Sequence, residues 1–409
     1  MNKNIFFLLL TIGFLFSCKN RDDDSKPLKN EEKKAVLYNE KLSSSNIPAD
    51  LYVTDATYGA DGLLITLPTQ LIMLDKYYSL GERICSFYFK TNNSAKINFG
   101  AISDVADYSN QDNYSVNFLT KTILYFYNNG YDSLNVPFLN ANNDYVAEII
   151  KNYNEITFKV TDLKTRESAY IIRTVDGTGG FGAGNLNPNY NIISTVRDKY
   201  AMYLEQGDYL LLKQIVVTAV KKDVDLLIYG DSISEPEGYY PLADFPKSWT
   251  QLVKKDIEEN GGKVLISGRG GNTISQVSER IKNELPYIKA KYVMVTIGTN
   301  GGNSEDNLTQ LISYIIACGS IPILNNIPSN EANTQIATNA IIESVRQKFG
   351  IKGCKFDIPT SLNYDGQTVD TSTMYLEDYS PSQQAYHHPN PKGAKLMYLR
   401  TKMDVPEIY

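Results

Sequence analysis

The sequence predicts two folded parts, an all-β sandwich of jelly-roll type followed by an α/β domain with a doubly wound parallel sheet. Two observations support this fold class. Residues 46–221 contain many short apolar or alternating runs separated by Asn, Asp and Gly clusters, which is typical of antiparallel two-sheet folds. In residues 222–409, patterns of buried strands and amphipathic helices alternate strictly, as in a parallel sheet flanked by helices.

The composition excludes several classes of protein. Of the 409 residues, 42% are hydrophobic and 21% are charged, an ordinary globular composition that argues against whole-chain disorder or a polytopic membrane protein. The formal net charge is −6, so no cationic excess exists to neutralise the phosphates of a nucleic acid. Only 2 histidines are present, His387 and His388, and any histidine-dependent catalysis must use one of them.

The first residues have the pattern of an export signal rather than of a folded element. A short basic start at Lys3 precedes an almost purely apolar run over 5–16, which is too short to span a bilayer as a mature helix. With the run from Leu15 to Cys18 behind it, the segment 1–17 resembles a bacterial lipoprotein signal peptide. The resemblance implies cleavage before Cys18 and a lipid on that residue. An ordinary secretory signal is the alternative.

Residues 18–45 are expected to form a flexible tether, because a segment dominated by charged residues and Asn cannot bury a core. The triplet Asp22–Asp24 resembles the surface-export signal of lipoproteins in the Bacteroidetes. The protein is therefore expected to be secreted and anchored to the bacterial outer membrane at the cell surface. Attachment on the periplasmic face is the alternative.

The sandwich, residues 46–221, is expected to bury one face of each strand. In the strand predicted over 83–89, period-two alternation puts Cys85, Phe87 and Phe89 on one inner face. Further strands are predicted over 95–101, 114–119, 122–127, 145–150, 155–160, 169–173 and 209–219. The region is similar to concanavalin-like lectin and glucanase sandwiches, which implies carbohydrate binding. A sandwich that only packs against and positions its neighbour is the alternative.

The α/β domain, residues 222–409, is expected to be a three-layer, flavodoxin-like fold. Strands are predicted over 224–229, 264–266, 292–297, 321–324 and 354–358. Helices are predicted from Ser248 to Asn260, with apolar faces over 274–281, 308–315 and 341–349, and at the C-terminus. In such a sheet the ligand site lies beyond the carboxyl ends of the strands.

Polar residues gather at that predicted edge. Gly230-Asp231-Ser232 follows the first strand, the glycine-rich loop 267–272 the second, and Gly298-Thr299-Asn300 the third. The run 387–393, which contains both histidines, precedes the C-terminal helix and can return to the same edge. A serine, a histidine and neutral hydrogen-bond donors are the groups that acyl transfer needs, so the sequence predicts a nucleophilic ester-cleaving site.

In this order and strand context, the motifs resemble those of the SGNH, or GDSL-type, hydrolases, over about the last 45% of the chain. The resemblance implies that Ser232 is the nucleophile and His388 the general base. It further implies an oxyanion hole made by the backbone N–H groups of Ser232 and Gly271 and the side-chain amide of Asn300, with Gly270 as an alternative to Gly271. No metal or organic cofactor is implied.

One position departs from the family pattern. These hydrolases usually carry Asp three residues before the catalytic His, and Ala385 stands there. Three interpretations remain open. His388 is held by a backbone carbonyl, by water or by Gln384; another carboxylate, Asp378 or Glu377, takes the place of the missing acid; or the enzyme is inactive.

The function expected from these observations is hydrolysis of ester groups, above all O-acetyl groups, on an acylated polysaccharide or oligosaccharide. Hydrolysis of lipid or other short-chain esters is one alternative, and a surface glycan-binding lipoprotein without catalysis is another. His387 is expected to point away from the site, and the adjacent histidines are not expected to bind metal. Tyr239 and Tyr240 are candidates for lining a subsite, whereas Trp249 is expected to pack in the core.

Overall fold

The computed structural model describes residues 33–409, except for 55, 69, 103–111, 128–129, 175–198, 236, 238–239 and 381–382. The expected signal peptide and Cys18 lie outside the described residues. Lys33–Tyr409 forms one compact unit, which we divide into a sandwich region up to residue 221 and an α/β region from residue 222. None of its described helices is long and apolar enough to cross a membrane.

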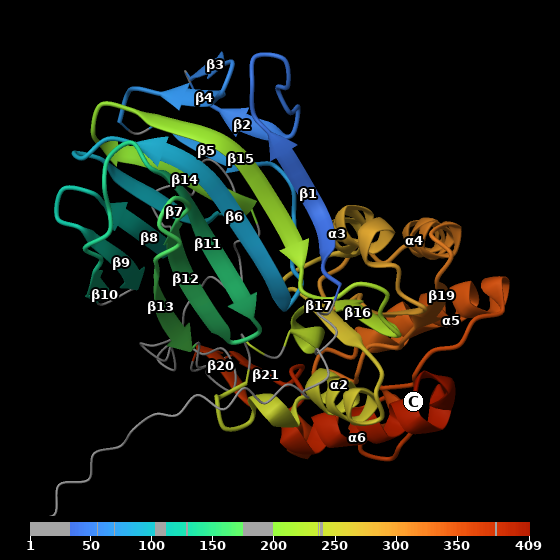
Figure 1. Cartoon of the computed structure of the whole chain (residues 1–409). Helices are drawn as coiled ribbons and strands as arrows, with labels where there is room; N and C mark the ends of the chain where they lie inside the picture. The colour runs from blue at the N-terminus through green and yellow to red at the C-terminus, as the bar shows by residue number, and fades with distance from the viewer. Residues whose placement is uncertain are drawn as a thin grey trace, which may run out of the picture. The chain divides into compact units, whose positions relative to one another are not determined.

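The sandwich region consists of two antiparallel sheets (Figure 1). The first contains β1 (Ala35–Lys41), β3 (Thr57–Gly59), β4 (Gly62–Ile65), β6 (Glu82–Thr91), β11 (Asp144–Asn152), β12 (Glu155–Asp162), β13 (Ser168–Thr174) and β15 (Leu210–Ala219), in the order β13-β12-β11-β6-β15-β4-β3 with β1 beside β15. The second contains β2 (Leu51–Val53), β5 (Leu71–Leu74), β7 (Lys96–Ile102), β8 (Asp112–Asn117), β9 (Thr122–Tyr127), β10 (Gly130–Asn135) and β14 (Lys199–Gln206), in the order β10-β9-β8-β7-β14-β5-β2.

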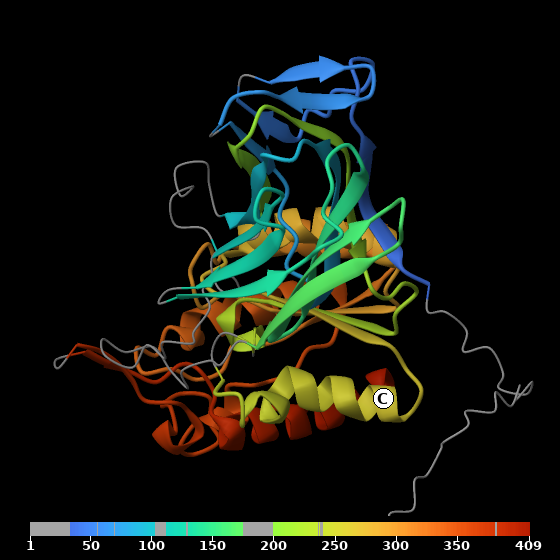
Figure 2. The same cartoon turned by 60° about the vertical axis from the view of Figure 1, so that its left-hand side comes forward.

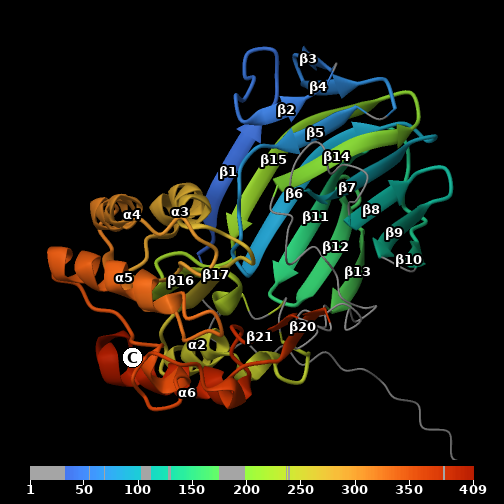
Figure 3. The ribbon, with the colours of Figure 1, turned by 180° about the vertical axis from the view of Figure 1, so that it is seen from behind.

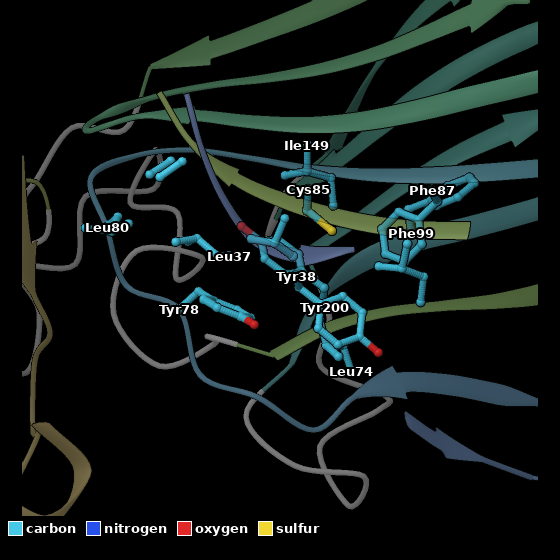
Figure 4. Packing of buried hydrophobic residues seen from close by; sticks show 14 of the residues in the cluster. Leu37, Tyr38, Leu74, Tyr78, Leu80, Cys85, Phe87, Phe99, Ile149 and Tyr200 are labelled. Atoms are coloured by element: carbon cyan, nitrogen blue, oxygen red, sulfur yellow. The ribbon is translucent and has the colours of Figure 1, made fainter. Parts of the chain in front are cut away.

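Aromatic side chains fill the space between these sheets. The ring centroids of Phe87 in β6 and Phe99 in β7 lie 5.5 Å apart, and those of Tyr114 in β8 and Phe158 in β12 lie 4.8 Å apart. Each pair joins the first sheet to the second, so the two sheets face each other. Figure 4 shows Phe87 and Phe99 in this packing. Cys85 is completely buried in the same core, on the face that the alternation predicts.

The expected tether is too long by one strand. Residues 35–41 form β1, which pairs antiparallel with β15. Ala35, Leu37 and Tyr38 are buried, and their apolar surface stabilises the strand against the sheet. Charged residues surround this short apolar run, so the composition of the whole segment predicts a tether. Because β1 begins at Ala35, the tether can extend only to about residue 34.

The α/β region has the predicted three layers. Its parallel sheet runs in the order β17-β16-β18-β19. The elements are β16 (Leu226–Gly230), β17 (Val264–Gly268), β18 (Tyr292–Thr296), β19 (Ile321–Leu324), α2 (Trp249–Glu259), α3 (Ile274–Ile288), α4 (Glu305–Ala317), α5 (Gln335–Phe349) and α6 (Pro391–Asp404). A hairpin of β20 (Glu377–Ser380) and β21 (Gln383–Ala385) precedes α6, and short 3-10 helices cover Ser232–Ser234, Phe245–Lys247, Ile358–Thr360, Thr371–Thr373 and Pro406–Ile408.

Both faces of the parallel sheet are covered by helices. Leu227 and Tyr229 of β16 belong to one buried cluster, with apolar residues of α3, α4 and α5, whereas Leu226 and Ile228 belong to a second cluster with residues of α2 and α6. Neighbouring residues of one strand thus face opposite helix layers, as strand geometry requires. Figures 2 and 3 show α3 and α4 on one side of the sheet and α2 and α6 on the other.

The fifth predicted strand, 354–358, does not form. The chain meets β19 only at a single parallel bridge, between Ile323 and Lys352, and then continues with Cys354 donating its N–H to the side-chain oxygen of Asn325 at 2.8 Å. A side chain thus replaces the next backbone acceptor, and the bond from the Asn326 N–H to the Cys354 carbonyl at 2.9 Å follows without forming a strand. The apolar run remains buried without strand pairing, because Cys354 and Phe356 pack in the second cluster.

Candidate active site

Ser232 lies in a tight turn directly beyond the end of β16, a strand with a neighbour on each side. Asp231 caps this turn, because its carboxylate accepts a hydrogen bond from the Ile233 N–H at 3.0 Å. Burial raises the pKa of Asp231 to about 6 against the hydrogen bonds from Ile233 and Thr299 that stabilise its charge. The structure therefore gives Asp231 a turn-forming role, and it puts Ser232 at the predicted edge of the sheet.

Two glycines at the strand ends allow the turn to approach the sheet closely. A Cβ added to Gly230 would lie 2.3 Å from Ser234 Oγ, and a Cβ added to Gly268 of β17 would lie 2.4 Å from the Ser234 carbonyl. Any side chain at either position would push the turn away from the strand ends. These glycines thus let the turn that carries Ser232 pack directly against the ends of β16 and β17.

The two loops that carry the other predicted donors are joined. The side-chain amide of Asn300, after β18, donates to the Asn272 carbonyl, after β17, at 3.1 Å. The neighbouring Gly271 has a φ of +73°, a conformation that favours glycine. The Gly270 N–H donates to Glu235 Oε2 at 2.6 Å. The bond from Asn300 to Asn272 therefore brings the Gly271 and Asn300 donors onto adjoining loops. An amide side chain carries two hydrogens, so Asn300 has a second one besides the hydrogen in this bond.

His388 is fixed by hydrogen bonds of the surrounding backbone. Its carbonyl accepts from the Tyr375 N–H at 2.9 Å, and the next carbonyl, of Pro389, accepts from the Tyr240 hydroxyl at 2.5 Å. Asn390 then caps α6, since its side-chain oxygen accepts from the first free N–H groups of the helix. His388 is 4% exposed and Tyr240 is equally buried, so Tyr240 supports the His388 loop from the inside.

A buried carboxylate from a neighbouring strand contacts His388. Glu377 Oε1 lies directly against His388 Nδ1, and Glu377 is completely buried. Glu377 in β20 stands opposite Ala385 in β21. Because the Cβ atoms of such cross-strand partners lie only about 4.5–5.5 Å apart, the carboxylate reaches His388 from the strand next to Ala385, the position at which the sequence lacks the expected acid.

One of the carboxylates that the sequence offered thus contacts His388. The partner that the structure describes at His388 Nδ1 is Glu377. The backbones of Asp378 and Gln384 pair with each other in the hairpin, and their side chains lie outside the described residues. The sequence alone does not fix the register of this hairpin, so it offers Asp378 and Glu377 as alternatives.

The expectation that His387 points away from the site is wrong. His387 Nε2 lies 3.4 Å from Glu377 Oε2, the second oxygen of the carboxylate that contacts His388. On its other side, His387 Nδ1 lies 3.7 Å from Glu331 Oε2, which also accepts from the Tyr386 N–H at 3.0 Å. The two histidines and two glutamates form a continuous chain, Glu331–His387–Glu377–His388.

The two histidines of this chain have opposite electrostatic environments. Burial lowers the pKa of His388 below its usual 6.5, against the opposing effect of Glu377. Burial would also lower the pKa of His387, but its contact with Glu331 and the charges of Glu377 and Glu331 raise it above 6.5. The same contact with His387 overcomes burial and brings the pKa of Glu331 down to about 2. The surroundings of His388 therefore favour its neutral form, whereas those of His387 favour its charged form.

This difference predicts a pH dependence. The acidic limb of kcat/KM for a neutral ester should follow His388 deprotonation and lie below pH 6.5. The nearby positive His387 lowers the pKa of His388, so a His387→Gln variant should move the acidic limb to higher pH. A pH profile of both proteins measures this shift. An unchanged limb, or one moved to lower pH, would contradict the assignment.

Glu377, His387 and His388 also offer potential ligand atoms for a metal ion, all within 4.8 Å of one another. The geometry is better described as a proton-sharing chain. Glu377 Oε1 and His388 Nδ1 face each other directly, so a cation could use both atoms only after the contact had opened. We therefore treat the cluster as an imidazole–carboxylate pair.

Two further residues play supporting roles. Trp249 is completely buried and donates its indole N–H to the Ile233 carbonyl at 2.8 Å, so it packs in the core, as predicted, and holds the turn beside Ser232. Tyr239 lies outside the described residues.

Sequence reasoning overlooked Glu235, which is completely buried three residues after Ser232. An acidic residue so close behind the predicted nucleophile is the signal that could have identified it.

Part of the chain is similar in structure to several solved hydrolases. No protein-family model and no curated protein matches the chain. A GDSL-like lipase from Bacteroides thetaiotaomicron is 16% identical over 45% of this chain and 88% of its own, with a TM-score of 0.35. TesA is 18% identical over 45% of this chain and 99% of its own, with a TM-score of 0.37. Axe2, an acetylxylan esterase from Geobacillus stearothermophilus, is 14% identical over 44% of this chain and 94% of its own, with a TM-score of 0.35.

Proposed function

We propose that the protein is a serine ester hydrolase with Ser232 as the nucleophile and His388 as the general base. The observation that carries the proposal is the buried contact between His388 and Glu377. A carboxylate on one imidazole nitrogen leaves the other nitrogen to accept a proton, and it stabilises the imidazolium that results. The inactive, glycan-binding alternative rested on the missing acid at Ala385, and Glu377 supplies that acid.

The proposed reaction passes through an acyl-enzyme. Ser232 Oγ attacks the ester carbonyl carbon while His388 Nε2 takes the hydroxyl proton. The tetrahedral intermediate then collapses, the bond to the alcohol breaks, and His388 returns the proton to the leaving oxygen. Water, deprotonated by His388, attacks the acyl-enzyme, and the second collapse releases the carboxylic acid and restores Ser232.

Three neutral donors would stabilise the oxyanion of both tetrahedral intermediates. They are the Ser232 N–H, the Gly271 N–H and the second hydrogen of the Asn300 amide. The alternative donor Gly270 is less suitable, because its N–H already binds Glu235. The bond from Asn300 to the Asn272 carbonyl supports this set, because it ties the amide to the loop of Gly271.

For the substrate we propose O-acetyl esters on a polysaccharide or oligosaccharide. Ser232 is only 6% exposed, which favours a small acyl group over a long chain at the nucleophile. A lipid anchor on Cys18, at the outer surface of the outer membrane, would present the site to such glycans. The proposed chemistry requires neither a metal nor an organic cofactor.

Acetate release tests the activity and the substrate together. The compact unit, residues 33–409, should release acetate from acetylated xylan, from acetylated pectin or from an aryl acetate, and the Ser232→Ala variant should release none. Preference for a polymer would support the carbohydrate proposal, and activity on the aryl acetate alone would favour short-chain esters. Equal release by both proteins, or none by either, would contradict the serine hydrolase.

A further inference from the structure

A buried cluster of four charged side chains connects the sandwich region to the loops of the candidate active site. Lys151, on β11 of the sandwich, pairs with Glu237 at 2.9 Å, with side chains 5% and 2% exposed. Arg269, in the loop after β17, lies 3.5 Å from Glu235, with side chains 2% and 0% exposed. Two basic and two acidic side chains thus lie together in a space that water barely reaches.

Glu235 joins the two catalytic loops within this cluster. Its backbone N–H donates to the Ser232 carbonyl at 3.2 Å, and its carboxylate accepts from the Gly270 N–H at 2.6 Å. One residue therefore contacts both the nucleophile's backbone and the loop of the proposed Gly271 donor. Burial raises the pKa of Glu235, and the positive charges of Arg269 and Lys151 oppose that rise.

The sandwich region is anchored to the α/β region close to Lys151. The turn after β11 inserts Tyr153, 5% exposed, into the buried cluster of the α/β region formed with α2 and α6. The Tyr153 hydroxyl donates to Glu82 at 2.9 Å, and the Gly81 N–H donates to the Ile266 carbonyl of β17 at 2.7 Å. Lys151 is thus presented to Glu237 from a strand whose end is anchored in the α/β core.

We propose that Lys151 is a positioning residue of the hydrolase site, so that the sandwich region completes the active site instead of only standing beside it. The inference rests on the proposed serine hydrolase. Lys151 pairs with Glu237, which stands two positions after Glu235 in the sequence, and the bonds of Glu235 set the spacing between Ser232 and the Gly271 loop. A misplacement of about 1 Å between such groups can cost about 10²-fold in rate.

The test compares matched lysine variants of residues 33–409. Lys151→Met keeps the aliphatic length and removes the charge, and we expect kcat for an aryl acetate to fall about 10²-fold with little change in KM. Lys159→Met is the control. Lys159 also forms an ion pair within the sandwich, with Glu148 at 3.1 Å, but their side chains are 35% and 21% exposed, and kcat should remain that of the wild type.

A double variant separates positioning from folding. Lys151→Met leaves Glu237 buried without its partner, which destabilises the fold, whereas Lys151→Met with Glu237→Gln leaves no unpaired charge. We expect the double variant to regain the thermal midpoint of the wild type but not its kcat, because the ion pair between Lys151 and Glu237 is still absent. If kcat returns together with stability, or if the single variant keeps wild-type kcat, the inference is wrong.

The same assay distinguishes this inference from the proposed function. A wild-type protein that neither hydrolyses the ester nor reacts with a phosphonate probe would overturn the serine hydrolase itself. An active wild type with an equally active Lys151→Met variant would overturn only the role of Lys151. If Lys151→Met alone does not fold, the kcat of the double variant decides between the two outcomes.

Discussion

Replacing Ser232 with Ala, or His388 with Ala, is expected to lower kcat for ester hydrolysis by about 10⁴–10⁶ in either case. Each change removes one of the two groups that must act together, the nucleophile or the base that takes its proton. A variant that lacks both should therefore be no slower than either single variant. Steady-state kinetics on an aryl acetate measures all three.

The control for this prediction is Ser234→Ala. Ser234 lies in the same short turn as Ser232 and is completely buried, but it has no part in the proposed chemistry. Its variant should keep most of the wild-type kcat. Equal losses in Ser232→Ala and Ser234→Ala would mean that the turn, and not the Ser232 hydroxyl, is what activity requires.

Replacing Glu377 with Gln should lower kcat by about 10³–10⁴. The Gln amide has the size of the carboxylate but carries no charge, so it cannot stabilise the imidazolium of His388. It can also donate to Nδ1, which holds the proton on Nε2, the nitrogen that must accept it from Ser232. The loss should appear in kcat, because the charge on His388 develops only along the reaction path.

Three other variants act as controls for Glu377. Glu331→Gln removes a carboxylate that contacts His387 but not His388, so it should reduce kcat far less. Asp378→Asn and Gln384→Ala test the two residues that the sequence also offered as partners, and both should remain active. A larger loss in any of them than in Glu377→Gln would contradict the role given to Glu377.

The sequence predicted the α/β fold well because its signals are local. Each buried strand is a short apolar run, and α2 to α5 each have an apolar face. Ser304 before α4 and Asn390 before α6 also cap their helices with side-chain hydrogen bonds. The carboxyl edge of a parallel sheet then brought together Ser232, Gly271 and Asn300 without further information. Strand β1 and the irregular segment 354–358 were misjudged, because in each case a tertiary contact, not the local pattern, decides the structure.

The acid of the site could not be predicted with the same certainty. Glu377 and Ala385 lie eight positions apart in the chain, and only the register of the β20–β21 hairpin makes them neighbours. Lys151 presents the same difficulty over a longer range, because its partner Glu237 lies in the other region of the fold. Both contacts depend on where whole elements meet, which no local pattern records.

The most direct test of the central claim is to identify the residue that reacts with a fluorophosphonate. Only a serine with an activated hydroxyl should react, so peptide mass spectrometry of the labelled protein should find the adduct on Ser232. Glu377→Gln should label much more slowly and Ser232→Ala not at all. A folded wild-type protein that remains unlabelled, or that carries the adduct on another residue, would contradict the serine hydrolase assignment.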